Sequence, residues 1–395
     1  MFPTDVVILA GARTPMARYN GEFANISAID LGALAAKEAI KRSGIDAGEI
    51  DHVVFGNVQQ SSSDAHYGAR HVGLKAGLKV ETPAVTVNRL CGSGMEAISQ
   101  AAQRILLGEA KTVLAGGMEN MTQVPHVIRG ARSGFRLGEG KLEDALMAGL
   151  LDPISGCTMS DTAENLAAEY KITRGESDEY ALRSQQAAEA AYKACRMSEE
   201  IVPVEVGKGK KAHLFSQDDH RRADTTMESL SALPPAFRKD GVVTAGNASG
   251  IVDGGAAVVM TTEKLAKERG IKPLGRIVSW ATTGVEPRMM GIGPVSSSNK
   301  ALQLAGLKLD QIDLVEVNEA FAPQYLAVEK ALGLNRDKTN VNGGAIALGH
   351  PLGATGTRLI LTLLLELRRR NQRYGLATAC IGGGQGIAMI IESMS

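Results

Sequence analysis

Cys91 is placed for nucleophilic chemistry, because it stands between a strand-like segment, 84–87, and the start of a helix-like one. At a helix N-terminus, unpaired N–H groups and the helix dipole stabilise a thiolate and lower the pKa of the thiol. The glycines that follow it allow a sharp turn and the close approach of a substrate. We therefore predict a reactive thiol at Cys91, with a buried, inert cysteine as the structural alternative.

The run at 92–97, Gly-Ser-Gly-Met-Glu-Ala, also fits the GxGxxA turn that binds dinucleotide phosphates. That fingerprint needs an acidic residue about 20 positions further on. The nearest acidic candidate after the next predicted strand is Glu119, which comes later. The pattern therefore favours nucleophilic chemistry over dinucleotide binding.

Three further residues could assist a nucleophile. His350, among small residues and ahead of a helix, is either a loop histidine or a base that reaches the nucleophile. Cys380 follows the predicted strand 376–379 and precedes a glycine-rich turn, whose N–H groups could stabilise an oxyanion; a thiol with a pKa near ~8.5 can also move protons near neutrality. Asn318 also follows a strand, and by itself it is typical of a helix cap.

An internal repeat indicates how these residues could meet. Gly44-Ile45 and Ile50-Asp51 recur, at one common offset, as Gly306-Leu307 and Ile312-Asp313. Each copy continues into a strand and later has a glycine-rich strand-to-helix turn. Two stacked copies of one unit would bring corresponding strand ends to a shared centre. Cys91 from one half would then face the other three residues.

Helices and strands alternate through both ends of the chain, which predicts an α/β fold with largely parallel strands. Residues 120–248 differ, being rich in Met, Arg and polar side chains, and they predict an insertion with one long amphipathic helix at 177–195. The predicted strands are 6–10, 53–55, 84–87, 112–115 (ending at Gly116-Gly117) and 314–317. One predicted helix ends at Ser43-Gly44, and another buries Met95, Ile98, Ala102, Ile105 and Leu106.

Composition excludes several classes of protein. The 43 Lys and Arg balance 43 Asp and Glu, so the chain as a whole offers no attraction to nucleic acid or anionic membranes. At 44% hydrophobic and 22% charged residues, the sequence is typical of a globular protein. Its 45 glycines, without a repeating period, predict many tight turns and close backbone approaches.

The four cysteines show no CxxC spacing, and no His/Cys cluster has the spacing of zinc ligands, so we expect no metal site and a reducing compartment. The sequence enters a predicted strand at Val6 without a signal-like segment, and no apolar run reaches the ~18 residues of a membrane span. We expect a cytoplasmic protein with no membrane span, or a mitochondrial matrix protein if the source is eukaryotic.

Four motifs, taken together, resemble those of the thiolases, and the resemblance runs from Val6 to Glu392. It implies the thiolase fold: two βαβαβαββ halves stacked as five α-β-α-β-α layers with an inserted loop domain, usually in homodimers or homotetramers. The implied domains are 1–119 (completed by about 249–271), the loop insertion 120–248, and 272–395. The motifs are Asn88-Arg89-Leu90-Cys91-Gly92-Ser93-Gly94, Asn318-Glu319-Ala320-Phe321-Ala322, Gly349-His350-Pro351-Leu352-Gly353 and Cys380-Ile381-Gly382-Gly383-Gly384-Gln385-Gly386.

The resemblance also implies a ping-pong acyl transfer between acyl-CoA and CoA, without a permanently bound cofactor. Cys91, activated by His350, would carry the acyl group, and Cys380 would move the α-proton of acetyl-CoA. One oxyanion hole would use His350 and a water held by Asn318, and the other the N–H groups of Cys91 and Gly382. The residues implied to contact CoA or substrate are Leu150, Arg222, Ser229, Ala245, Ser249, Met290, Ala320 and Phe321.

One departure bears on specificity. Thr158 stands where acetoacetyl-CoA-forming members commonly have histidine, and residues 60–65 and 323–329 look more like mitochondrial-type 3-ketoacyl-CoA thiolases. We therefore expect a broad, short-to-medium-chain enzyme of fatty acid β-oxidation type that also accepts acetoacetyl-CoA. The alternatives are a ketosynthase-like condensing enzyme, which lacks the second cysteine, and a non-catalytic acyl-CoA or lipid-binding relative, which need not keep Cys91 and Cys380.

Overall fold

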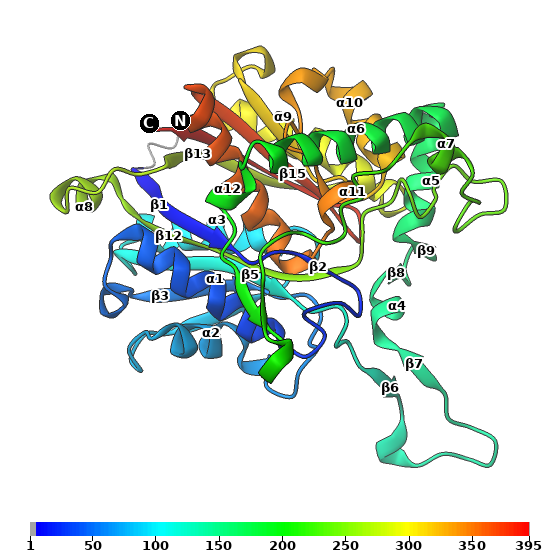
Figure 1. Ribbon diagram of the computed structural model, residues 1–395, viewed down its shortest axis with the longest axis horizontal. Helices are drawn as coiled ribbons and strands as arrows, with labels where there is room; N and C mark the ends of the chain where they lie inside the picture. The colour runs from blue at the N-terminus through cyan, green and yellow to red at the C-terminus, as the bar shows by residue number, and fades with distance from the viewer. Residues whose placement is uncertain (1–4, 395) are drawn as a thin grey trace.

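The computed structural model describes residues 5–394, and ten of its strands form one sheet with two halves of similar order (Figure 1). The N-terminal half has two parallel pairings followed by antiparallel ones, and the C-terminal half has one parallel pairing, β14 with β15, followed by antiparallel ones. The halves meet where β1 pairs antiparallel with β13. The N-terminal half runs β4 (Ala84–Val87), β3 (His52–Gly56), β5 (Thr112–Glu119), β12 (Val252–Thr262) and β1 (Val6–Arg13), with β2 (Ala17–Arg18) beside β12. The C-terminal half runs β14 (Leu314–Val317), β15 (Tyr374–Ile381), β16 (Gln385–Ser393) and β13 (Gly275–Gly284).

The structure confirms the repeat. Helices α1 (Ala28–Ser43) and α9 (Gly293–Ala305) both end at a left-handed glycine, with φ of 71° at Gly44 and 69° at Gly306, and each is followed by a single 3-10 turn and a parallel strand. The second half departs at its third strand, which shrinks to one bridge between Val315 and Thr339. Asn340 explains this: its φ of 47° turns the chain away, and its side-chain amide bonds both backbone groups of Val317 in place of a ladder.

The layers follow from alternating side chains. Val6 and Ile8 of β1 point into a central apolar cluster, whereas Val7 and Leu9 point to an outer one. The central cluster holds α3 (Ser93–Leu106) and α12 (Leu352–Arg370) between the two halves of the sheet. Helices α1 and α2 (Gly68–Ala76) cover one outer face, and α9 and α10 (Ala322–Leu332) cover the other, which makes the five predicted layers.

Glycines allow the central helices to touch. A Cβ on Gly94 would lie 2.7 Å from the backbone N of Thr357 and 2.8 Å from the carbonyl O of Gly353. Strand β5 runs through Gly116-Gly117 instead of ending there. Position 117 requires glycine, because a side chain there would collide with the backbone of α12. Leu106 also differs from the prediction: it ends α3 and is 41% exposed.

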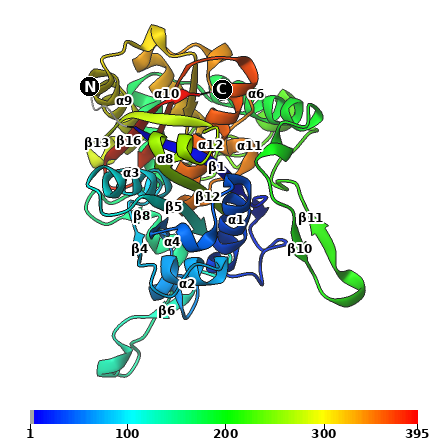
Figure 2. The same cartoon turned by 90° about the vertical axis from the view of Figure 1, so that its left-hand side faces the viewer.

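Residues 120–248 contain more structure than the predicted helix. That helix, α6 (Arg174–Lys193), begins earlier than predicted because Thr173 and Glu176 form a capping box, and it stops before Cys195, whose φ is 55°. Two hairpins project from the body (Figure 2). The other elements are α4 (Ala145–Gly149), α5 (Met159–Glu169), α7 (Met227–Ser231) and the pairs β6 (His126–Ile128) with β7 (Leu142–Asp144), β8 (Leu151–Asp152) with β9 (Cys157–Thr158), and β10 (Val204–Val206) with β11 (His213–Phe215). Outside this stretch lie α8 (Glu263–Glu268) and α11 (Ala345–Leu348).

None of the helices within residues 5–394 has the length and apolar character needed to cross a membrane.

Candidate active site

Cys91 lies in a tight turn between β4 and α3. Leu90, just before it, has a φ of 47°, a left-handed conformation that costs energy for a residue with a Cβ atom. The turn is fixed from both sides, since the N–H of Leu90 donates to Asn88 Oδ1 at 2.9 Å and Ser93 Oγ donates to the carbonyl of Leu90 at 2.6 Å. With α3 beginning at Ser93, the sulfur faces a helix N-terminus, as predicted.

The pKa of Cys91 contradicts the prediction of a lowered value. Burial raises it to about 11, and the N–H groups of Gly382 and of Cys91 itself, which donate to the sulfur, offset only part of that rise. Cys91 is 8% exposed. The resting residue is therefore a thiol, and a thiolate forms only when a base takes its proton.

Cys380 and Gly382 reach the same place from the other half of the molecule. Cys380 lies on β15 and is fully buried, and burial, followed by the charge of Cys91, raises its pKa. The expectation that Cys380 titrates near neutrality is therefore wrong for the resting site. Gly382 follows the strand directly, and its N–H donates to the sulfur of Cys91. The structure thus brings both cysteines and the glycine-rich turn together.

His350 is held as a neutral base. Its Nδ1 lies 2.6 Å from Thr355 Oγ1, which itself donates to the carbonyl of Pro351 at 3.1 Å. Because that hydroxyl proton is used, Nδ1 must carry the hydrogen, which leaves the lone pair on Nε2, 3.3 Å from Asn318 Nδ2. Burial, with a smaller contribution from Arg358, lowers the pKa of His350 to about 3.

Thr355 was not predicted, because a lone threonine one turn into a helix carries no sequence signal.

Asn318 Oδ1 is buried, and no hydrogen-bond partner for it exists among residues 5–394.

Glu119 is a second residue that the sequence left without a role. It ends β5 and is fully buried, and burial raises its pKa to about 7. Its carboxyl accepts hydrogen bonds from the N–H groups of Val58 (3.2 Å), Gln59 (2.9 Å) and Gly353 (2.8 Å), and from the side chain of Asn57. It therefore ties the loop after β3 to the first turn of α12, three residues beyond His350.

Several predicted contact residues surround the sulfur centre. Met290 and Ala320 form an apolar cluster with Cys380, against which Met159 and Phe321 pack. Ser249 joins them through its N–H, which donates to the carbonyl of Ala320 at 3.0 Å. Leu150 joins through its carbonyl, which accepts from the N–H of Met159 at 3.0 Å.

Phe237 extends this wall outward, although the sequence did not single it out. Its ring meets that of Phe321 edge-on, with 6.5 Å between centroids, and 53% of Phe237 is exposed.

The remaining predicted contacts lie at the surface. Arg222, Ser229 and Ala245 are exposed, so the structure does not bring them into the buried centre. The backbone N–H of Arg222 donates to Gln185, and Ser229 forms the capping box of α7 with Thr226. Among residues 5–394 there is also no group of three or more His, Cys, Asp or Glu side chains that could hold a metal ion.

Comparison with known proteins assigns the chain and its fold to one family. Residues 6–264 match the model for the thiolase N-terminal domain, and residues 271–393 match that for the thiolase C-terminal domain. The chain belongs to the thiolase family. This thiolase is 51% identical over 389 residues to human mitochondrial 3-ketoacyl-CoA thiolase, covering 98% of each chain. It is also 51% identical over 391 residues to acetyl-CoA acetyltransferase of Escherichia coli, covering 98% of this chain and 99% of that protein.

Solved structures agree with the family assignment. The human mitochondrial 3-ketoacyl-CoA thiolase in complex with CoA superposes with a TM-score of 0.96 at 51% identity, covering 98% of each chain. The acetyl-CoA acetyltransferase of Bacillus anthracis superposes with a TM-score of 0.96 at 45% identity, also covering 98% of each chain. The chain is therefore an acyltransferase with the mixed α/β fold of the thiolases.

Proposed function

We propose that this thiolase cleaves 3-ketoacyl-CoA with CoA, and runs the reverse Claisen condensation, through an acyl group held on Cys91. The observation that carries the proposal is the meeting of Cys91 and Cys380 from opposite halves, with the Gly382 N–H on the Cys91 sulfur. CoA and acyl-CoA are the substrates, and no cofactor stays bound. Adding CoA to enzyme and acetoacetyl-CoA should remove the acetoacetyl-CoA absorbance. If neither acetoacetyl-CoA nor longer ketoacyl-CoAs disappear on adding CoA, the proposal fails.

The first half-reaction needs one base and two sets of donors. As the Cys91 sulfur attacks the keto carbon, its proton passes to Nε2 of His350, which is unprotonated at rest. Burial disfavours both charged forms, so proton transfer and attack are coupled, and the negative charge moves to the substrate oxygen. The N–H groups of Cys91 and Gly382 would donate hydrogen bonds to that oxygen.

The carbon–carbon bond then breaks. The electron pair leaves with acetyl-CoA as an enolate, stabilised by protonated His350 and a water held by Asn318, and the Cys380 thiol gives that enolate a proton. The acyl group stays on Cys91 as a thioester. CoA thiol then attacks this thioester and loses its proton to the Cys380 thiolate. The Cys91 sulfur leaves as a thiolate and takes its proton back from His350, which restores both cysteines and the neutral histidine.

Substrate range depends on the space beside Cys91. The sulfur belongs to an apolar cluster that includes Leu146, Leu352, Val58 and Val124. Val58 and Val124 also line a cavity of about 530 Å³, so an acyl chain on Cys91 has an apolar path outward. We propose on this basis that the enzyme accepts short and medium chains.

A phenylalanine at Val58 should shorten that range, because the larger ring fills the path. In Val58→Phe we expect kcat/KM for 3-ketooctanoyl-CoA and 3-ketodecanoyl-CoA to fall about tenfold or more, with acetoacetyl-CoA within about threefold. The measurement is kcat/KM for the wild type and the variant across this series. A wild-type enzyme active only on acetoacetyl-CoA, or an equal loss at every length, contradicts the proposal.

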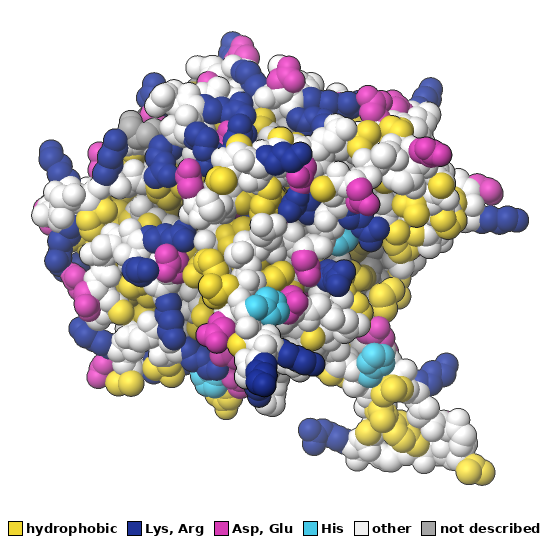
Figure 3. Space-filling view, in the orientation of Figure 1, with side chains coloured by type: hydrophobic (Ala, Val, Ile, Leu, Met, Phe, Trp, Pro, Cys, Tyr) yellow, Lys and Arg dark blue, Asp and Glu magenta, His cyan; other side chains and the backbone are white. Residues whose placement is uncertain are grey.

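The β6–β7 hairpin, 126–144, suits assembly into a homotetramer, since it projects from the body and carries apolar side chains (Figure 3). Leu137 is fully exposed, and Ile128, Phe135 and Leu142 are 45–68% exposed. Apolar side chains gathered on one exposed segment mark protein–protein contacts. We expect the wild type to sediment as a tetramer and Leu137→Asp with Leu142→Asp as a dimer. A wild-type dimer, or a tetramer unaffected by the double change, contradicts this arrangement.

The same proposal includes a division of the chain into three domains and a cellular compartment. The proposed domains are an N-terminal half at 1–119, completed by about 249–271, an insertion at 120–248, and a C-terminal half at 272–395. The position of β12 between β1 and β5 supports this division. The four cysteines are all free thiols, which supports a reducing compartment such as the cytoplasm, or the mitochondrial matrix in a eukaryote.

A further inference from the structure

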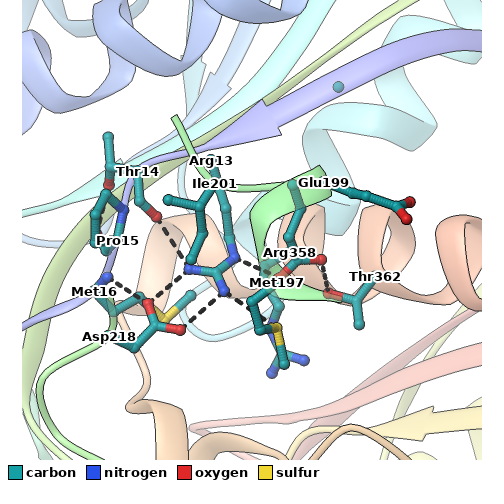
Figure 4. A network of polar contacts seen from close by, with 12 residues as sticks. Arg13, Thr14, Pro15, Met16, Met197, Glu199, Ile201, Asp218, Arg358 and Thr362 are labelled. Atoms are coloured by element: carbon teal, nitrogen blue, oxygen red, sulfur yellow. Dashed lines mark hydrogen bonds and ion pairs between the residues drawn. The ribbon is translucent and has the colours of Figure 1, made fainter. Parts of the chain in front are cut away.

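A buried ionic cluster joins the insertion to the end of β1, outside the sulfur centre (Figure 4). Arg13, the last residue of β1, is fully buried. Its Nε donates to Glu200 at 2.7 Å, and its Nη1 and Nη2 donate to the two carboxylate oxygens of Asp218 at 2.7 and 2.9 Å. A paired, doubly bonded guanidinium of this kind fixes geometry as well as charge. Both carboxylates come from the insertion, so the cluster fixes it to the core.

Asp218 is the more heavily anchored end. Besides Arg13, its carboxylate accepts from the N–H of Met16 at 2.7 Å and from the hydroxyl of Tyr192 at 2.7 Å. The Tyr192 oxygen also accepts from the N–H of Asp218 at 2.8 Å. Side chain and main chain of Asp218 are therefore both held in place, and Tyr192 connects them to α6.

Asp218 opens a short segment, 218–222, that runs back to the surface. The next residue, Asp219, contacts β2 and the residue before it, since its N–H donates to the carbonyl of Met16 and its carboxylate accepts from the N–H of Arg18. At the far end, the N–H of Arg222 donates to Gln185 at 2.9 Å while its side chain is exposed. The main chain is thus held at Asp218 and Asp219 and again at Arg222, whose guanidinium is open to solvent.

We propose that Arg13, Asp218 and Tyr192 are positioning residues for the coenzyme, because they hold segment 218–222 so that Arg222 meets the phosphate groups of CoA. The inference rests on the proposed function and on the thiolase resemblance, which implies that Arg222 contacts CoA. The chain as a whole has no net charge that would attract a polyanion, so binding of the CoA phosphates depends on individual cationic side chains. A cation on a fixed segment binds more tightly than one on a loop that must be ordered on binding.

The opposite end of the cluster supplies a matched control. Glu200 Oε2 accepts from the hydroxyl of Thr362 on α12 at 2.7 Å. Thr362→Val removes one buried hydroxyl hydrogen bond at Glu200, whereas Tyr192→Phe removes the hydroxyl at Asp218. Phenylalanine also keeps the aromatic ring that lies 4.2 Å from the Arg221 guanidinium.

The experiment compares two thiol acceptors in the cleavage of one ketoacyl thioester: CoA, which has the nucleotide phosphates, and pantetheine, which has none. In Tyr192→Phe we expect KM for CoA to rise about three- to tenfold, the effect of one hydrogen bond, with kcat within about twofold. KM for pantetheine should not change, and Thr362→Val should leave both values unchanged. Arg222→Ala should raise KM for CoA at least as much as Tyr192→Phe.

Three outcomes overturn the inference. If Arg222→Ala raises KM for CoA but Tyr192→Phe behaves like Thr362→Val, CoA placement stands and the positioning role fails. An equal rise of KM for CoA and pantetheine in Tyr192→Phe means that the cluster acts through general packing. If Arg222→Ala leaves KM for CoA unchanged, Arg222 does not contact the phosphates, and the inference fails. Thermal melts verify that each variant is folded, and Asp218→Asn, which keeps the side-chain volume, serves as a second variant with the same expected pattern.

Discussion

Cys91→Ala is expected to lower kcat for thiolysis by about four orders of magnitude or more, because the proposed mechanism holds the acyl group on the Cys91 sulfur. The measurement is loss of acetoacetyl-CoA absorbance with CoA, joined to the intact mass of the enzyme after exposure to substrate. The wild type should gain one acyl group, and the variant none. Alanine removes only the sulfur from the turn that Leu90 and Ser93 fix, so the fold should not change.

The other free cysteines provide the control for that variant. Cys157 is buried and Cys195 exposed, and the mechanism uses neither. Cys157→Ala and Cys195→Ala should each keep kcat within about twofold of the wild type and still gain one acyl group. Cys91→Ala with a rate within about tenfold of the wild type would remove Cys91 as the nucleophile, although the assignment to the family would stand.

Sequence reasoning predicted the meeting of Cys91, His350, Asn318 and Cys380, because duplicated α/β units bring corresponding strand ends to one centre. It failed on the pKa values of the two cysteines. A helix N-terminus is visible in the sequence, but the burial that raises the pKa of Cys91 to about 11 depends on side chains from both halves. The local sequence pattern therefore located the thiol. It did not show that burial raises the pKa of Cys91 by more than the helix N-terminus lowers it.

The polar supports of the site were missed for a related reason. Arg13 and Asp218 are separated by 205 positions in sequence, and Glu119 and Gly353 by 234. Arg13, Asp218 and Glu119 lie outside the four motifs, and each of them alone is typical of a solvated charge. Only the packed fold shows that these side chains are buried and paired.

Cys380→Ser should separate the two halves of the reaction, because a serine hydroxyl has nearly the volume of the thiol but is far less acidic. Thiolysis and condensation should fall by about two to four orders of magnitude, the usual effect of losing a general acid or base. Exchange of the acetyl-CoA methyl hydrogens with deuterium from solvent should be lost for the same reason. Acylation of Cys91 by acetyl-CoA should still be detectable by mass, since Cys91 and His350 are intact.

Cys157→Ser is the matched control, since it makes the same change at another buried cysteine and should retain both deuterium exchange and turnover. If Cys380→Ser turned over within about tenfold of the wild type, proton transfer at the α-carbon would belong to another group. His350 would be the first to test, because its Nε2 is unprotonated at rest and could accept that proton. Loss of acylation in Cys380→Ser would instead mean that the second cysteine is also needed to generate the nucleophile. The separation of roles between the two thiols depends on which of these results is obtained.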